Sequence, residues 1–413
     1  MVASRPLGRW PGLGTPGASI EEGSPIDRWV IILLILLAVL ILYRKKIEWS
    51  LILKDNIALL FLCVFAGISI LWSDFPFLSF KRWIKLLGAI PIAMVVLNEK
   101  SPTEAIESVF RRVGYVLVPF SLLFIKYYSY LGRAYGRWSG AEMWIGVTST
   151  KNGLGQLCAI AAFFFIWAFF RDWREKRFAK IRFVKVMDGL VLAIAIFLLK
   201  GTGGGYSATS VAVLIAGTVS LLILYRKKDT VKRISMLLVF TSVILWIFMA
   251  FSEPFVREVT KILGRDETLT GRTEMWQLLI EAGARKPILG TGYGGYFGTP
   301  GNEFFEVQGG SVVGHNGLLD SYVELGLVGV ILVLIFHMGF YVRFLREINR
   351  SFEWGIFGIC FLVMALLFNF TESLFLRSQT YIWNITIFLS VIFSAPDLQK
   401  NKIKCFKRNG NTK

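Results

Sequence analysis

The chain has few of the residues on which most catalytic and metal sites depend. It contains only 2 histidines and 4 cysteines among 413 residues, and charged residues make up 18% of the sequence. The histidines, His315 and His337, are separated by most of an apolar run, so they cannot share an ion. No HExxH motif, no cysteine pair spaced for a metal and no GxSxG motif is present. We therefore expect no metal site, no cofactor and no serine nucleophile.

The cysteines also give no sign of a disulfide framework. Cys63, Cys158 and Cys360 lie within apolar runs, and Cys405 lies in a basic tail. Such positions are typical of packing residues rather than of extracytoplasmic disulfides. The first 28 residues contain arginine but no apolar stretch before Ile31, so we do not expect a cleavable signal peptide, and the first span itself directs insertion.

What the sequence has in abundance is apolar runs. Hydrophobic residues make up 54% of the chain, and runs such as WVIILLILLAVLILY (29–43) have no polar face. This pattern predicts an all-α polytopic membrane protein rather than a soluble one. We expect eleven spans, with an uncertainty of one, at residues 29–43, 57–73, 83–97, 113–129, 153–170, 187–199, 207–225, 235–251, 317–337, 355–370 and 379–395.

Basic residues predict the orientation of these spans. The net charge is +18, and many lysines and arginines fall in loops on one side, which the positive-inside rule assigns to the cytoplasm. Their scatter over short loops argues against nucleic-acid binding. With eleven spans the N-terminus lies outside. The chain then divides into an N-terminal extension (1–28), eight spans (29–251), a large outer loop (252–316), three spans (317–395) and a basic cytoplasmic tail (396–413).

Two outer loops are long enough to suggest function, residues 130–152 and 252–316. Within the second, residues 271–287 predict a short amphipathic helix, which lies on the outer membrane surface or over a cavity. Thr270 or Thr273 is a candidate N-cap, and Pro287 follows the end. The apolar face of this helix is formed by Met275, Leu278, Leu279 and Ala282.

The large outer loop carries several basic residues, although the positive-inside rule predicts that most basic residues lie on the cytoplasmic side. Since arginine binds phosphate oxygens bidentately and keeps its charge, these residues indicate an anion site. A solvated loop or contact with lipid headgroups is the alternative. Arg272 is favoured because it opens the predicted helix. The cations are Arg257, Lys261, Arg265, Arg272, Arg285 and Lys286.

The glycine-rich segment GTGYGGYFGTPG (290–301) resembles a phosphate-binding loop, but no strand precedes it and no helix pattern follows. We interpret it as a flexible lid. Tyr293 and Tyr296 lie either against sugar faces or at the membrane interface as anchors.

His315 and Asn316 stand where this loop enters a predicted span, with Asp320 and Glu324 one turn apart near its outer end. Ionisable residues at such depth usually face an interior cavity, and a helix N-terminus favours their negative charge. His315 is then a candidate general base toward a hydroxyl; a capping or structural imidazole is the alternative. His337 has no convergent polar partner, so we interpret it as structural.

Together these segments resemble the O-antigen ligase and polysaccharide polymerase superfamily, including its exopolysaccharide polymerase branch. The resemblance implies transfer of a glycan from undecaprenyl diphosphate to an acceptor hydroxyl at the outer face of the bacterial inner membrane, with inversion and without a metal. It implies that Arg272 holds the diphosphate and that His315 assists the acceptor or the leaving group. The matching segments are LWSDFPFLSFKRW (71–83), WIGVTSTKNGLG (144–155), GRTEMW (271–276), KPILGTGYGGY (286–296) and GHNGLLDSYVELGLVG (314–329).

The sequence departs from the family in one place. The family has a Ser-Arg or Ser-Lys pair at the start of the span at 207–225, where this chain has Ala208. Lys200 or Lys151 is a candidate replacement for that cation, with a snorkelling lysine as the alternative for Lys200. Arg265, Arg285, Lys286 and Asn316 are further candidates to bind diphosphate or substrate.

Three functions remain open from the sequence. A polymerase joins carrier-linked oligosaccharides, with the polysaccharide export machinery as a partner, whereas a ligase transfers to lipid A core. A transporter or flippase of polysaccharide precursors is a different class, but no broken pair of spans recurs in both halves of the chain. We favour the polymerase.

Overall fold

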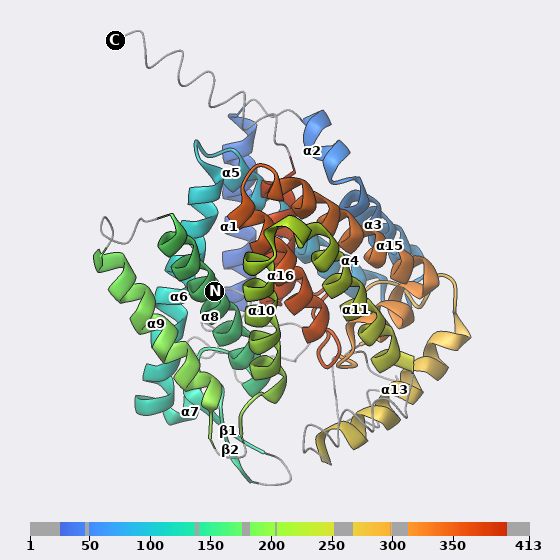
Figure 1. Ribbon diagram of the computed structural model, residues 1–413. Helices are drawn as coiled ribbons and strands as arrows, with labels where there is room; N and C mark the ends of the chain where they lie inside the picture. Colours follow the sequence, from blue (N-terminus) through green and yellow to red (C-terminus); the bar gives the residue numbers. More distant parts are fainter. Residues whose placement is uncertain are drawn as a thin grey trace.

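The computed structural model describes residues 25–45, 49–136, 140–175, 182–202, 205–251, 267–297, 299 and 313–394. Its elements follow one another along the chain as α1 (Pro25–Tyr43), α2 (Trp49–Asp55), α3 (Ile57–Ile68), η3 (Ser69–Trp72), α4 (Pro76–Leu87), α5 (Ala89–Leu97), α6 (Pro102–Tyr127), α7 (Ser129–Gly132), β1 (Arg133–Tyr135), β2 (Glu142–Trp144), α8 (Lys151–Arg174), α9 (Arg182–Lys200), α10 (Ala208–Arg226), η5 (Lys228–Thr230), α11 (Val231–Phe251), α13 (Glu267–Arg285), α15 (Gly317–Ile348), α16 (Phe352–Phe368) and α17 (Tyr381–Ile392), as Figure 1 shows.

Each predicted span falls on one of these helices or on a pair of consecutive ones. In the described residues, five helices are long and apolar enough to cross a membrane, and four apolar helices are shorter. The chain is therefore a helical multi-pass membrane protein. The five long helices are α6, α8, α10, α15 and the helix that includes α11.

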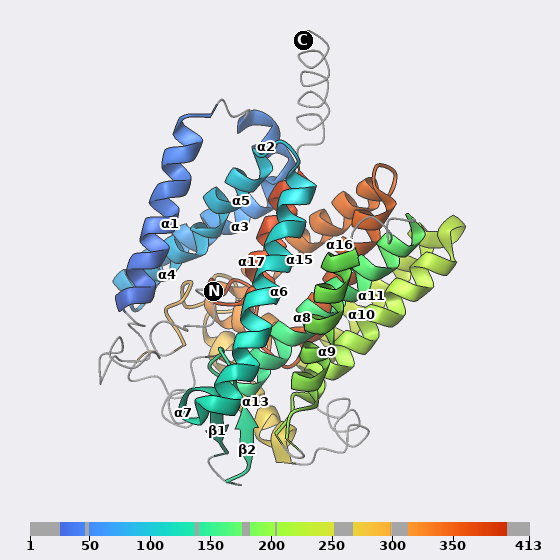
Figure 2. The same ribbon diagram turned by 90° about the vertical axis from the view of Figure 1, so that its left-hand side faces the viewer.

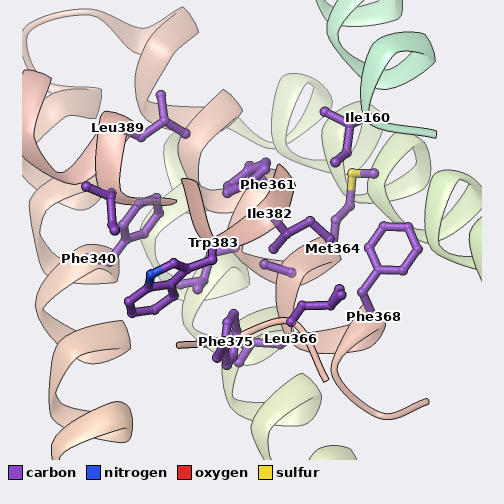
Figure 3. Packing of buried hydrophobic residues seen from close by; sticks show 14 of the residues in the cluster. Ile160, Phe340, Phe361, Met364, Leu366, Phe368, Phe375, Ile382, Trp383 and Leu389 are labelled. Carbon is purple, nitrogen blue, oxygen red and sulfur yellow. The ribbon is translucent and has the colours of Figure 1, made fainter. Parts of the chain in front are cut away.

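Helix α8 forms the centre of the bundle because it is apolar on every side. Its residues Phe163, Phe164, Phe165 and Trp167 are at most 1% exposed. The Trp167 ring lies 4.7 Å from that of Phe357 in α16. Outer helices such as α1 instead expose leucines, which suits contact with lipid. Aromatic residues of α15, α16 and α17 continue the core, as Figure 3 shows around Trp383 and Phe361.

The expectation of a purely helical chain misses one small sheet. Strands β1 and β2 pair antiparallel, with Arg133 opposite Trp144. Arg133 forms an ion pair of 3.0 Å with Glu142, whose carbonyl oxygen accepts a hydrogen bond of 2.5 Å from Thr202. The hairpin lies at the end of the bundle opposite α2 (Figure 2). Its three-residue strands are too short for a pattern of period two to reveal them.

Charged residues at the ends of α6, α8 and α9 form ion pairs inside the bundle. Arg171 of α8 contacts Glu107 at 2.5 Å, and Arg111 contacts Asp188 at 3.2 Å. Lys185 of α9 also pairs with Asp188, at 3.4 Å. Residues 171–185 form a basic segment between the predicted spans 153–170 and 187–199. Ion pairs with acidic side chains inside the bundle neutralise part of its charge.

Helix α15 is broken. The predicted span 317–337 reads as continuous, but Gly326 has a non-helical backbone with φ 64° and ψ −166°. At this break the backbone amides of Leu327 and Val328 donate hydrogen bonds to the carbonyls of Pro287 and Ile288, at 2.9 and 3.2 Å. The segment after α13 thus replaces the helix's own hydrogen bonds, and residues 317–325 form a separate half-helix.

The amphipathic helix of the outer loop is present as α13, but its start was mispredicted. Thr270 and Thr273 lie inside Glu267–Arg285, so neither is the N-cap. The predicted face is correct, since Met275 and Leu279 are buried. Trp276 donates a hydrogen bond of 2.9 Å to the carbonyl of Gly314. Packing against α15, rather than a local capping signal, determines where this helix lies.

Candidate functional site

The turn between α16 and α17, residues 369–380, is recessed in the bundle. Helix α16 has 17 residues and α17 has 12, which correspond to lengths of about 26 and 18 Å. Both are shorter than the hydrocarbon core of about 30 Å. Leu374, Phe375 and Leu376 are buried accordingly. Irregular backbone at such depth is tolerated only inside protein or beside a polar cavity.

Asn369 organises this turn. Its Oδ1 accepts hydrogen bonds from the backbone amides of Leu374 and Phe375, at 3.1 and 3.3 Å. Its carbonyl oxygen accepts from the amide of Gly317 at 3.2 Å and from the Trp246 indole at 3.1 Å. The turn is therefore attached to the first residue of the half-helix that follows His315.

His315 faces a carboxylate of the turn. Its Nδ1 lies 3.5 Å from Oε2 of Glu372, and Asn152 of α8 donates a hydrogen bond of 2.5 Å to the other carboxylate oxygen. The side chain of His315 is 32% exposed although Nδ1 itself is buried, so the exposed part of the ring lies on its other atoms. Nε2 is thus the ring nitrogen that does not face Glu372.

The backbone around His315 is held in an unfavourable conformation. His315 and Leu376 have φ values of 56° and 57°, in the left-handed region, where a side chain other than glycine costs about 1–3 kcal/mol. Asn316 caps α15 through Oδ1, which accepts from the amides of Leu318 and Leu319. Gly314 donates a hydrogen bond of 3.0 Å to Oδ1 of Asp320.

Arg377, which the sequence analysis did not select, neutralises the two acids of the half-helix. Its Nη2 lies 2.9 Å from Oδ2 of Asp320, and its Nη1 lies 3.1 Å from Oε1 of Glu324. Burial lowers the pKa of Arg377, but Glu324 and Asp320 outweigh this effect and hold the pKa above its ordinary value. The guanidinium therefore keeps its positive charge between the two carboxyl groups.

Residues 290–297 form a fixed wall, and the prediction of a flexible lid was wrong. The amides of Thr291 and Gly292 donate to the carbonyls of Val323 and Glu324, at 2.9 and 2.8 Å. Arg82 of α4 donates to the carbonyls of Gly294 and Phe297. Glycine permits these turns, and the backbone hydrogen bonds to α15 and the guanidinium of Arg82 anchor the segment at both ends.

The two tyrosines of this wall differ. Tyr293 is 3% exposed, and its hydroxyl donates a hydrogen bond of 2.7 Å to the carbonyl of Leu376. Neither the predicted sugar contact nor the interface anchor applies to a side chain so deeply buried. Tyr296 is partly exposed and lies edge-on to Phe297, with ring centroids 5.1 Å apart.

Two further helices begin beside the turn. Thr209 of α10 receives a hydrogen bond of 3.1 Å from Thr371, next to Glu372. Helix α8 begins at Lys151, beside Asn152. The two N-termini pack closely, because a Cβ on Gly155 would lie 2.4 Å from Oγ of Ser210. Helix N-termini favour anions, so this is the electropositive side of the site.

The structure describes only some of the remaining predicted cations. Ala208 is the first residue of α10, where the family has a cation, and Lys200 is the exposed last residue of α9. Arg272 lies in α13, but its side chain is outside the described residues, as are Arg257, Lys261 and Arg265 altogether. Arg285 is exposed at the end of α13, and Lys286 forms an ion pair of 3.7 Å with Asp74.

His337 is buried, but it does not lie at the end of its helix, where the predicted span 317–337 places it. Its ring centroid is 4.1 Å from that of Phe375 in the recessed turn, and Nδ1 is 2.7 Å from the carbonyl of Val333. Helix α15 continues to Ile348, so His337 lies in its interior, where Phe375 of the turn contacts the imidazole. The imidazole of His337 thus packs against the turn that carries Glu372.

The residues that sequence reasoning missed are Arg82, Asn152, Glu372 and Arg377. Asn152 and Arg82 stand in segments that carry the family resemblance, TSTKNGLG (148–155) and LWSDFPFLSFKRW (71–83). Glu372 and Arg377 are the charged residues between two apolar spans, in TESLFLRSQT (371–380). An ionisable residue at a span end was the available signal.

The sequence is similar to that of known proteins. Residues 189–334, which include α10 and His315, match the family model described as O-antigen ligase. The chain is also 30% identical over 281 residues to the exopolysaccharide production protein ExoQ of Rhizobium meliloti (strain 1021). That match covers 65% of this chain and 61% of the relative's length.

Proposed function

Because the chain belongs to the O-antigen ligase and exopolysaccharide polymerase-like family, we propose that it is a glycosyltransferase of the cell envelope. It transfers a glycan from a polyprenyl-diphosphate donor to an acceptor sugar hydroxyl, at the outer face of the bacterial inner membrane. The product is an extended exopolysaccharide or O-antigen chain, so the protein acts as a polymerase.

The observation that carries this proposal is the contact between His315 and Glu372. The Glu372 carboxylate, with Oε2 3.5 Å from Nδ1, is placed to orient the imidazole. Nε2 then accepts the proton of the acceptor hydroxyl as its oxygen attacks the anomeric carbon. Attack opposite the diphosphate inverts the configuration of that carbon, and the bond to the diphosphate breaks.

The departing diphosphate needs positive charge that does not depend on pH. The N-termini of α8 and α10 supply oriented backbone amides near the turn, and Lys151, the first residue of α8, is a candidate to supply an ammonium group. Arg272 of α13 supplies a guanidinium from the outer loop. Arg265, Arg285, Lys286 and Lys200 remain candidates for contacts with the glycan or the carrier. No metal takes part in this scheme.

The recessed position of the turn suits a lipid-linked donor. A diphosphate on a polyprenyl chain lies at the level of the headgroups, and the site lies at or beneath that level. The carrier therefore reaches the site from the bilayer, whereas the acceptor glycan approaches from the aqueous side. A nucleotide sugar is charged and soluble in water, so it would not reach the site through the bilayer.

The polymerase is favoured over the ligase by the printed name of the relative, which refers to exopolysaccharide production. Deletion of the gene separates the two activities. Loss of a polymerase leaves single repeat units, whereas loss of a ligase leaves long chains on the carrier.

The enzymatic test uses purified protein in proteoliposomes with carrier-linked oligosaccharide. We expect longer carrier-linked chains to form without any ion gradient. His315→Ala and Arg272→Ala should abolish elongation at normal protein levels, whereas Arg133→Ala on the hairpin should retain it. Movement of substrate across the bilayer without glycosidic bond formation would instead identify a transporter. Full-length glycan from both site variants would overturn the assignment.

A further inference from the structure

Arg377 connects three segments that surround His315. It pairs with Asp320 and Glu324 of the half-helix, and its guanidinium carbon lies 5.1 Å from the centroid of the Phe297 ring in the wall. Its own turn is fixed because Tyr293 donates a hydrogen bond to the carbonyl of Leu376. One side chain thus joins the half-helix, the wall and the recessed turn.

The geometry argues against direct contact between Arg377 and the diphosphate. Each of its terminal nitrogens already contacts a carboxylate, and its side chain is only 15% exposed. Asp320 and Glu324 are each 4% exposed and would repel an anion. Because both terminal nitrogens of the guanidinium already contact carboxyl oxygens, the cluster offers no unshared positive charge to a departing diphosphate.

The consequence of the cluster for His315 passes through two short connections. Asp320 accepts a hydrogen bond from the amide of Gly314, immediately before His315, and Glu372 lies in the same turn as Arg377. Movement of the half-helix would displace His315, and movement of the turn would displace Glu372. The strained backbone of His315 makes that position dependent on its surroundings.

We infer that Arg377 is a positioning residue, which holds the half-helix of Asp320 and Glu324 against the turn of Glu372 so that His315 meets the acceptor hydroxyl. Its role in turnover rests on the proposed function, whereas its structural effect does not. The prediction is that Arg377 affects the rate of the chemical step but not the affinity for the donor.

The kinetic test compares four forms of the full-length protein in proteoliposomes. Arg377→Gln should lower kcat by about 100-fold, since a small misplacement of a catalytic group has that effect, with the donor KM unchanged. Arg377→Lys should lie between, because one ammonium cannot replace two separate guanidinium contacts. Combining Arg377→Gln with Asp320→Asn and Glu324→Gln should recover part of kcat, since it removes the two uncompensated charges.

The matched control is the ion pair of Arg133 and Glu142 on the hairpin, 3.0 Å long, whose other hydrogen bonds go to Ile125, Trp144 and Thr202 rather than to the half-helix or the turn. Arg133→Gln should leave kcat and KM unchanged. A higher donor KM in Arg377→Gln, without recovery in the triple variant, would mean that Arg377 binds the diphosphate, and the inference would be wrong.

Hydrogen exchange tests the inference independently of activity. In Arg377→Gln, the amides of residues 313–325 should exchange faster than in the wild type, while those of α8 should not change. Equal exchange in both proteins would overturn the positioning role even if the enzyme is active. Faster exchange in Arg377→Gln, together with a wild-type protein that makes no glycan, would instead count against the proposed function alone.

Discussion

Asn152, the second residue of α8, donates a hydrogen bond of 2.5 Å to Glu372, which stands 220 residues later in the chain. This contact fixes one carboxylate oxygen of Glu372 and leaves the other toward His315. Helix α8 and the turn at residues 369–380 thereby contribute to one site. The contact also gives the first of four predictions.

Asn152→Ala should lower kcat by about tenfold or more, as is typical when the partner of an orienting carboxylate is removed. Asn152→Asp should be more damaging, because it places a second negative charge beside Glu372. Chain elongation in proteoliposomes measures both effects. Asn349→Ala, at the exposed far end of α15, is the control and should retain wild-type turnover. Equal activity of all three variants would remove Asn152 from the site.

Gly326→Ala should destabilise the fold by about 2 kcal/mol or more, because φ is positive there and the new Cβ meets backbone. That Cβ would lie 2.2 Å from the carbonyl oxygen of Ile288. Gly339→Ala on the same helix is the control, since its Cβ would meet nothing closer than 4.0 Å, and alanine is preferred there by about 0.5–1 kcal/mol. Thermal unfolding in detergent should order the proteins accordingly. A Gly326→Ala protein as stable as wild type would contradict the observed break.

Tyr293→Phe should cost about 1–3 kcal/mol, because it leaves the buried carbonyl of Leu376 without its donor. The hydroxyl of Tyr293 makes that hydrogen bond at 2.7 Å. Tyr130→Phe, at a position that is 67% exposed, should leave the unfolding temperature unchanged. If Tyr293→Phe unfolds at the wild-type temperature, the hydroxyl contributes nothing to the turn.

Arg82→Ala should release the wall at residues 290–297, since Arg82 donates to the carbonyls of Gly294 and Phe297. Hydrogen exchange in that segment should become faster, and elongation should fall. Lys81→Ala serves as the control, because Lys81 lies over the exposed ring of Phe77 at 4.9 Å. Slow exchange after loss of Arg82 would show that the hydrogen bonds to α15 hold the wall alone.

Several parts of the site followed from residue type and position alone. His315 stood at the entrance to an apolar span, and Asp320 and Glu324 were one turn apart at its outer end, where a helix favours negative charge. The structure places all three in one region. Their spacing within a single helix is a local property, so the sequence was sufficient to identify it.

Other parts required the tertiary structure. Glycines at 290–295 permit both a lid and a fixed turn, and only the hydrogen bonds to Val323 and Glu324 distinguish them. Likewise, the apolar pattern on both sides of Gly326 predicts a continuous helix, because hydropathy does not record which carbonyl a backbone amide will reach. The range of backbone conformations open to glycine is a local property, whereas the conformation adopted depends on hydrogen bonds to residues far away in the chain.

By itself, the sequence determined that this is a helical membrane protein in which a polar loop leads into His315, because long apolar runs cannot remain in water. Only the tertiary structure decided that Glu372, Asn152 and Arg377 surround that histidine and its half-helix. Their contacts join α8, α15 and the last turn. Pairing between charges so distant along the chain depends on how the helices pack, and no local pattern contains that information.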